Sequence, residues 1–521
     1  MQTLLQLIKI ITPKQLSKQY ILPSNISAQT KISKLYKGIY AADLTSDEQA
    51  IQEIYKGARN GKVNYRSLKR ELRKRLFNNI LLYEFGSDAS SSSNKKQVFF
   101  DCQKTFTIAY FLILLNARNI AIPLLRDKLE LMEKHEFTFL IVESIKLIRQ
   151  HVAVAEGDYE KIQYYNGVLE KWLKIQSVET KVDGLYYLLM ANFSRKKANK
   201  QFIYSLAKSY HNEIKYLISP ELSTSVIFKS KMIEIIMYKC DNDLDKVIEI
   251  CSTSIQELKN RPLPNRANIF LFYLQWMNSA LQVNQTEHMK RIAEEMLDYT
   301  SLAGFNWFVA KKMAYQAAIY REAYQAAANT YCQVMKYENE LKRYKILKED
   351  WKIIALSFDI LVKSKKIDTS LLEKVPNIKV AKTINELDIA NKDKQGKYVS
   401  VNIFKLVNLL IKHRYEEAEE HLAAFKQYKK RHLKEEEYQR IGVFIKLVNL
   451  LLRYRFNHDL LYQWLDTSLD EFSKKSSEDK YMELIPYEQL WSFVLEAVKH
   501  KSSDTRDIKE GAKQFGKMSL N

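Results

Sequence analysis

The chain has 521 residues, of which 46% are hydrophobic and 27% are charged, and its formal net charge at pH 7 is +21. Only 12 glycines and 8 prolines occur, which argues against turn-rich β architectures and Gly-built phosphate loops and favours helix throughout. The four cysteines show no CxxC spacing, and we expect them to be free thiols in a reducing cytoplasm.

Residues 1–98 are predicted to form a small basic helical module that ends in a Ser-rich linker. Residues 1–100 contain 17 Lys and Arg but only 7 Asp and Glu. The stretch MQTLLQLIKIITPKQLSKQ is interrupted by Lys9 and Pro13 and has no small-residue cleavage site, so it predicts an amphipathic first helix and not a signal peptide. Residues 86–96, GSDASSSSNKK, have the composition of an exposed linker.

A strongly basic helix is predicted at residues 62–85. Leu68, Leu72, Leu76 and Ile80 recur at four-residue spacing and give the helix one apolar face. The other faces carry seven cations: Lys62, Arg66, Lys69, Arg70, Arg73, Lys74 and Arg75. These are candidate contacts to phosphates or to an acidic protein surface, and binding through them would depend strongly on salt. In the alternative interpretation, their stems cover the apolar seam while the charged ends stay in water.

Residues 99–363 predict apolar helices arranged in pairs with short turns. FTIAYFLILL is followed by NIAIPLLRDKLELMEK, and FTFLIVESIKLIRQHVAVAE by YEKIQYYNGVLEKWLKI. Further pairs are predicted at residues 181–218, 222–259, 266–299 and 305–337. A pair of roughly 35–45 residues has the length of one α-α hairpin repeat. No run of eighteen apolar residues occurs, so no transmembrane helix is expected.

Three short segments resemble the tetratricopeptide repeat (TPR). VAEGDYEKIQYY, residues 154–165, resembles its turn and second helix, with Gly157 and Asp158 in the turn. HRYEEAEEHL, residues 413–422, resembles the same element, with Tyr415 and Ala418 at the matching positions, and REAYQAAANTYCQV, residues 321–334, is a third case. The resemblance implies an all-α fold in which α-α hairpin repeats stack into a right-handed, TPR-like superhelical solenoid.

The C-terminal part is predicted to contain a connecting segment (364–398), further helical repeats (399–500) and a polar tail (501–521). KLVNLL begins at Lys405 and again at Lys446, 41 residues later, which is a repeat length. Lys405 with Asn408, and Lys446 with Asn449, are candidate groove contacts, because a Lys and an Asn one turn apart are able to hold a carboxylate together. Alternatively, a neighbouring helix satisfies each Asn and water surrounds each Lys.

No catalytic, metal or cofactor site is predicted. The motifs GxxxxGK[ST], GxGxxG, GxSxG and HExxH are absent. His413 and His421 lie eight residues apart, which is too far for one metal ion on a single helix. Most of the 32 Tyr and 23 Phe are expected in the core of the repeats.

The sequence therefore predicts a non-catalytic binding, scaffold or regulatory protein of the cytoplasm. Its repeats would recognise a protein or peptide in a groove. The alternative is a nucleic-acid-associated adaptor, in which the basic N-terminal module contacts RNA or DNA phosphates through residues 62–75. An enzyme of unfamiliar type is a third possibility, because a long groove is able to hold a cluster of buried ionisable groups.

Overall fold

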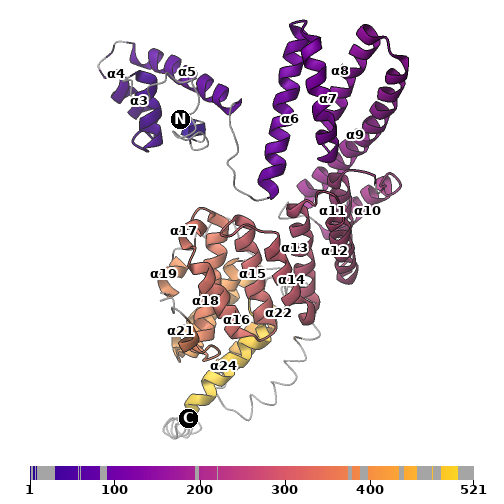
Figure 1. Ribbon diagram of the computed structural model, residues 1–521. Coiled ribbons are helices and arrows are strands. Elements are labelled where there is room, and N and C mark those ends of the chain that lie inside the picture. The colour runs from indigo at the N-terminus through magenta and orange to yellow at the C-terminus, as the bar shows by residue number, and fades with distance from the viewer. Residues whose placement is uncertain are drawn as a thin grey trace, which may run out of the picture. The chain divides into compact units, whose positions relative to one another are not determined.

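The computed structural model describes residues 1, 4–5, 7–8, 30–56, 58, 60–81, 91–193, 199–219, 221–372, 378, 380–385, 387, 397–432, 439–453, 472 and 483–502. Within these ranges the regular secondary structure is helical and no strand occurs, so the all-α prediction is confirmed. The chain divides into two compact units, Met1–Leu173 and Lys174–Asn521. Each is treated by itself below (Figure 1).

The first unit contains three helices that pack on one another: α3 (Lys31–Tyr40), α4 (Asp47–Tyr55) and α5 (Gly61–Leu81). Ser46 and Gln49 form a capping box at the start of α4, which satisfies free backbone N–H groups there. Tyr65 of α5 donates to Asp47 at 2.6 Å. Lys69 forms an ion pair with the same carboxylate at 2.8 Å, so Asp47 joins α4 to α5.

The rest of the first unit consists of longer helices: α6 (Ser91–Leu114), α7 (Arg118–Lys134), α8 (Thr138–His151), a π-helical turn (Val152–Glu156) and the start of α9 (Tyr159–Phe193). Part of the predicted Ser-rich linker is helical, because α6 begins at Ser91. Serine has only a modest helix propensity, and tertiary packing of the kind α6 makes with α7 commonly overrides such preferences. The rest of that linker lies outside the described residues.

Helix α9 differs from the prediction in its length. It runs for 35 residues, whereas the sequence predicted one helix ending near residue 175 and another beginning near 181. No proline interrupts the stretch between these positions, and nothing else there forces a helix to end. The boundary between the two units falls inside α9.

The second unit continues as packed helix pairs whose helices run roughly side by side (Figure 1). The first members are α10 (Lys200–Ile214), α11 (Thr224–Cys240), α12 (Leu244–Lys259), α13 (Arg266–Val283), α14 (Thr286–Asp298), α15 (Phe305–Tyr320) and α16 (Tyr324–Met335). The pairs predicted at 222–259, 266–299 and 305–337 are therefore present as α11–α12, α13–α14 and α15–α16.

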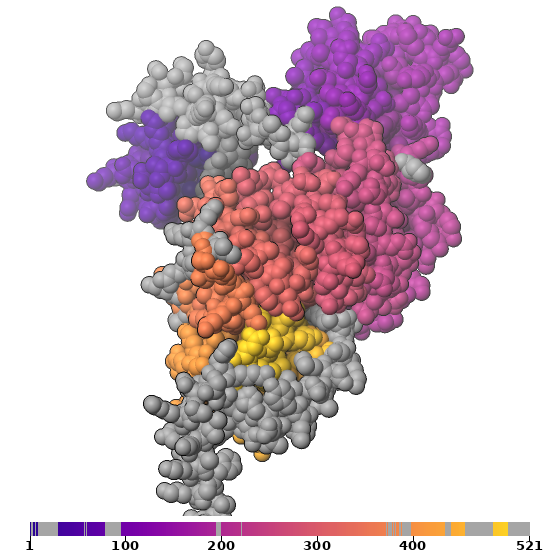
Figure 2. Space-filling view, turned by 60° about the horizontal axis from the view of Figure 1, so that its bottom comes forward, coloured from indigo at the N-terminus to yellow at the C-terminus, as the bar shows by residue number. Residues whose placement is uncertain are grey.

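The later helices of this unit are α17 (Glu338–Leu341), α18 (Lys345–Lys363), α19 (Val380–Asn385), α20 (Lys397–Ile411), α21 (Tyr415–His432), α22 (Gln439–Arg453) and α24 (Tyr487–Ser502). The two KLVNLL copies lie on α20 and α22. The surface of α24, yellow in Figure 2, borders that of the helices coloured pink to orange. The predicted tail lies outside the described residues from 503 onward.

Four of the turns between helices share one backbone geometry. A residue in the left-handed region ends the helix, and the N–H of the residue after it donates to a carbonyl five residues earlier, as in Ala117 to Leu112, Asp243 to Tyr238, Ala323 to Ala318 and Arg414 to Leu409. This is the Schellman arrangement. The left-handed residues are Asn116, Asn242, Glu322 and His413 in these four turns. Glycine, which adopts this conformation most readily, is replaced by other residues in all four.

Polar contacts join the first helices of successive pairs in the second unit. Asp350 of α18 pairs with Lys312 of α15 at 2.6 Å and with Lys397 of α20 at 2.7 Å. Tyr315 of α15 and Ser357 of α18 are hydrogen-bonded at 2.8 Å. Because Ser357 donates to the Ile354 carbonyl, Tyr315 must be the donor to Ser357. None of the helices in the described part of the chain has both the length and the apolar character needed to cross a membrane.

Candidate functional site

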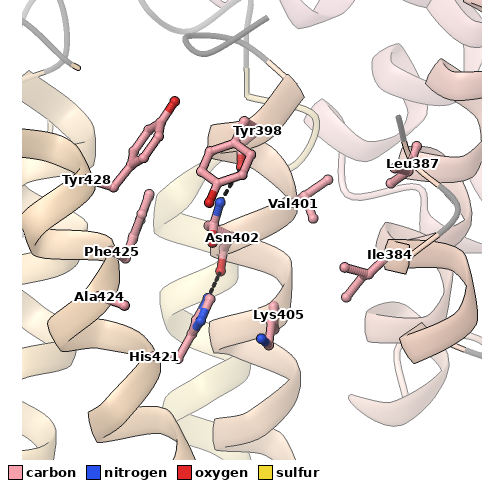
Figure 3. A pocket seen from close by; sticks show the side chains of 10 residues that line it. All are labelled: Ile384, Leu387, Tyr398, Val401, Asn402, Lys405, His421, Ala424, Phe425 and Tyr428. Carbon is pink, nitrogen blue, oxygen red and sulfur yellow. Dashed lines mark hydrogen bonds between the residues drawn. The ribbon is translucent and has the colours of Figure 1, made fainter. Parts of the chain in front are cut away.

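A pocket of about 350 Å³ opens over α20, between α21 and the region of α19 (Figure 3). It is lined by Ile384, Leu387, Tyr398, Val401, Asn402, Lys405, His421, Ala424, Phe425 and Tyr428. The volume lies at the small end of the range for ligand sites, and most of the lining side chains are apolar or aromatic. The pocket therefore fits one or two side chains of a partner and not a long segment.

Lys405 supplies the positive charge of this pocket. Most side chains of α20 are buried, but Lys405 is exposed and faces the pocket (Figure 3). It forms no ion pair with any acidic side chain that the structure describes. An ammonium group beside apolar walls, with its charge uncompensated, favours an anionic group on a ligand.

His421 is held as a neutral hydrogen-bonding group beside Lys405. Burial lowers the pKa of His421, and the positive charge of Lys405 lowers it further. Its Nε2 lies 3.2 Å from the Asn402 carbonyl oxygen, so this nitrogen carries the proton and donates. The Asn402 side chain in turn donates to the Tyr398 carbonyl at 2.7 Å. These contacts fix the wall formed by α20 and α21.

Aromatic rings form the other end of the pocket. The ring centroids of Tyr398 and Tyr428 lie 4.4 Å apart, and Phe425 is buried next to them. Such an aromatic surface favours an apolar or aromatic group of a ligand. The pocket thus combines one cation with an aromatic wall within the length of α20.

Neither a metal site in the described residues nor a similar protein indicates the function of this chain. Among the residues that the structure describes, no group of His, Cys, Asp and Glu is arranged to hold a metal ion. His413 bonds the Tyr415 hydroxyl at 2.7 Å and His421 bonds α20, so the two perform separate roles. No family model, curated protein or solved structure matches this chain.

The other predicted groove residues have different surroundings. Asn408 is buried, and its amide donates to the Asp359 carboxylate of α18 at 2.7 Å, so it does not share a site with Lys405. Lys446 is exposed on α22. Asn449 accepts a hydrogen bond from Lys426 of α21. The structure thus brings Lys405 to a pocket and engages both asparagines with neighbouring helices.

The seven cations of the basic helix fall into two groups. Lys69 pairs with Asp47, and Arg75 pairs with Glu71 at 2.7 Å. The other five, Lys62, Arg66, Arg70, Arg73 and Lys74, are exposed and pair with none of the acidic side chains that the structure describes. Lys62, Arg66, Arg70 and Arg73 follow one another at spacings of four, four and three residues, so they lie along one face of α5.

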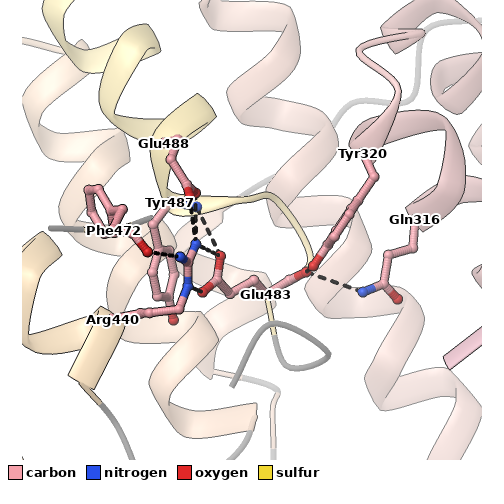
Figure 4. Close-up of polar contacts among 7 residues, drawn as sticks. All are labelled: Gln316, Tyr320, Arg440, Phe472, Glu483, Tyr487 and Glu488. Carbon is pink, nitrogen blue, oxygen red and sulfur yellow. Dashed lines mark hydrogen bonds and ion pairs between the residues drawn. The ribbon is translucent and has the colours of Figure 1, made fainter. Parts of the chain in front are cut away.

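A buried ionic cluster was missed by the sequence analysis (Figure 4). Arg440 of α22 is fully buried and binds Glu483 at 2.6 Å and Glu488 at 2.8 Å. Its Nη1 donates to the Phe472 carbonyl at 2.8 Å, and Tyr320 of α15 donates to the Glu483 carbonyl at 3.0 Å. Arg440 lies six residues before the second KLVNLL and directly before the apolar stretch IGVFI, which was the available signal. None of these residues lines the pocket over α20.

Proposed function

We propose that the protein is a non-catalytic binding protein that captures a protein or peptide partner in the pocket over α20. The observation that carries this proposal is Lys405, a cation that pairs with no described acidic side chain and lies in a pocket with aromatic and aliphatic walls. In this proposal the helix pairs stack as a right-handed, TPR-like superhelix, a form that suits recognition of extended partners. The four free cysteines suit a reducing compartment such as the cytoplasm.

The pocket suggests the chemistry of the partner. Lys405 and a neutral His421 favour a carboxylate, which a lysine ammonium binds by a charge-assisted hydrogen bond. Tyr398, Phe425 and Tyr428 favour a large apolar side chain next to that carboxylate. We therefore expect a peptide that presents an acidic group beside an aromatic or aliphatic residue.

Other lysines of the second unit are less suited than Lys405 to bind a partner, because they already make contacts within the protein. Lys312 and Lys397 share Asp350, and Lys239 of α11 bonds Gln275 of α13. A partner that competes for these lysines must first break contacts within the protein, which costs binding energy. Lys405 pairs with none of the described acidic residues, so a partner is able to bind it without breaking such a contact.

Selection from a random peptide display library, with the full chain as bait, tests the proposal. We expect enrichment of peptides in which Asp, Glu or a free C-terminus stands beside a large apolar residue. Synthetic copies of the enriched peptides should bind the Lys405→Glu variant at least tenfold more weakly, because the charge at the pocket is reversed.

A matched control is Lys430→Glu, which makes the same charge change at an exposed position of α21 that does not line the pocket. This variant should bind the peptides with an affinity within about twofold of the wild type, because it changes only a charge outside the pocket. Equal loss in the two variants, or enrichment of basic peptides, would contradict the proposal. Lys446→Glu separately tests whether the second predicted lysine contributes.

A further inference from the structure

A second surface, in the first unit, combines aromatic rings with lysines. Lys95, Lys96, Phe99 and Phe100 of α6, together with Phe137 at the start of α8, line a cavity of about 300 Å³. Phe99 is 46% exposed, and its ring meets that of Phe137 edge to face at a centroid distance of 5.1 Å. A flat apolar ring of a ligand is therefore able to stack on Phe99 without displacing any core side chain.

The acidic side chains that the structure describes do not neutralise the lysines around this cavity. Lys95 lies over the Phe137 ring at 5.9 Å, and Lys104 lies over the Phe100 ring at 5.0 Å. Lys95 and Lys96 form no ion pair with any described acidic residue. Aromatic rings for stacking and cations for a phosphate backbone are the two elements that single-stranded nucleic-acid sites combine.

The basic face of α5 is an independent observation that favours the same class of ligand. The series from Lys62 to Arg73 is about 17 Å long at 1.5 Å per residue, and it contains three arginines, whose guanidinium groups match phosphate geometry. Leu81 and Ser91, the adjoining ends of α5 and α6, are ten residues apart, so at most about 36 Å separates them. Roughly ten nucleotides cover that distance even at the 3.4 Å rise of a stacked strand.

We propose that the first unit binds single-stranded nucleic acid, with a base stacked on Phe99 in the α6–α8 cavity and the phosphates held by Lys95, Lys96 and the basic face of α5. A single strand is favoured over a duplex because the cavity requires an unstacked base. It is favoured over an acidic protein because the aromatic lining of the cavity matches a planar ring, and over an anionic membrane because a cavity of about 300 Å³ has room for a single ring.

Fluorescence anisotropy of the full chain with labelled oligo-dT and oligo-rU of about 20 nucleotides tests the proposal. Titrations at salt concentrations between about 50 and 200 mM give the salt slope of the affinity. We expect Phe99→Ala to weaken binding about tenfold, because it removes one stacking contact, and to leave the slope unchanged. We expect Arg66→Gln/Arg70→Gln/Arg73→Gln to reduce the slope by about two, at roughly 0.7 per phosphate contact.

The matched control for charge is Arg343→Gln/Lys345→Gln/Lys348→Gln, which removes three exposed cations from the second unit. It should keep the wild-type slope, and circular dichroism should show that all variants are folded. Four results would overturn the proposal. They are no oligonucleotide binding by the intact chain at about 50 mM salt, unchanged affinity in Phe99→Ala, an equal slope change in the control triple, or displacement of the oligonucleotide by phosphatidylserine vesicles.

Discussion

At the scale of single residues, Asp350 stabilises contacts among three helices. It is mostly buried, with its side chain 13% exposed, and it is bound by Lys312 and Lys397. Burial alone would raise the pKa of Asp350, but the two lysines hold it below its ordinary value. A carboxylate whose pKa is depressed by folding stabilises the folded state at every pH above its ordinary pKa, and this contribution is lost as the pH falls through the folded value.

We predict that Asp350→Asn lowers the free energy of unfolding by about 1–3 kcal/mol at pH 7, since it leaves two partly buried lysines without their shared anion. The difference from wild type should stay constant between pH 7 and pH 5. It should shrink below about pH 4, where Asp350 takes up a proton in the unfolded chain and, at lower pH, in the folded chain. Urea unfolding at a series of pH values measures it. Asp241→Asn, at an exposed C-cap, is the control, and a pH-independent difference would contradict the prediction.

The two copies of KLVNLL show how much the sequence alone predicts about single residues. Both lysines are exposed, and Leu and Val at the second and third positions are buried in both copies, as helical periodicity predicts. The asparagines differ, because Asn408 meets Asp359 of α18 whereas Asn449 meets Lys426 of α21. Neither the aromatic wall beside Lys405 nor the partner of Arg440 follows from periodicity, because each depends on which helix packs next.

At the scale of elements, the helix pairs and their turns were largely predictable. The apolar periodicity placed α11 to α16 within a few residues, and Gly157–Asp158 forms the predicted turn before α9. Four other turns gave no glycine signal, since Asn116, Asn242, Glu322 and His413 occupy their left-handed positions. Helix α9 was divided wrongly because periodicity alone does not distinguish one long helix from two short ones.

Replacing glycine by alanine should change the free energy of unfolding in opposite directions at Gly157 and Gly167, which tests this turn geometry. Gly157 has φ +63° and Gly167 lies inside α9, and a Cβ at either position would contact nothing within 4 Å. Gly157→Ala should lower the free energy of unfolding by about 1 kcal/mol through backbone strain. Gly167→Ala should raise it by about 0.5–1 kcal/mol through helix propensity. Thermal or urea denaturation measures both changes. Effects of the same sign would contradict the left-handed conformation of Gly157 or the helical position of Gly167.

At the scale of the whole second unit, Arg440 joins segments that are far apart in the sequence. It binds Glu483 and Glu488 near the start of α24, and Glu483 accepts from Tyr320 and Gln316 of α15 through its carbonyl. Burial raises the pKa of Glu483, and the charge of Arg440 opposes this shift. The carboxylate therefore depends on the guanidinium to remain ionised in the core.

We predict that Arg440→Met destabilises the protein by about 3–5 kcal/mol, because it leaves Glu483 buried without a counter-charge. Adding Glu483→Gln in the same chain should recover part of the loss, since the uncompensated charge is then removed. Arg453→Met, at an exposed position of the same helix, should change stability by no more than about 0.5 kcal/mol. Equal effects at Arg440 and Arg453 in urea denaturation would contradict the role of the cluster.

The Arg440 cluster has a consequence for modularity. Arrays of helical repeats are commonly shortened or extended one unit at a time, because each unit contacts only its neighbours. Here the segment before α24 satisfies hydrogen-bonding groups on α15, more than 160 residues earlier in the chain. Cutting the chain before residue 483 would remove both carboxylates that bind Arg440 and the carbonyl that accepts from Tyr320 and Gln316. The second unit is therefore indivisible at this end, and fragments for binding studies should retain α15, α22 and α24 together.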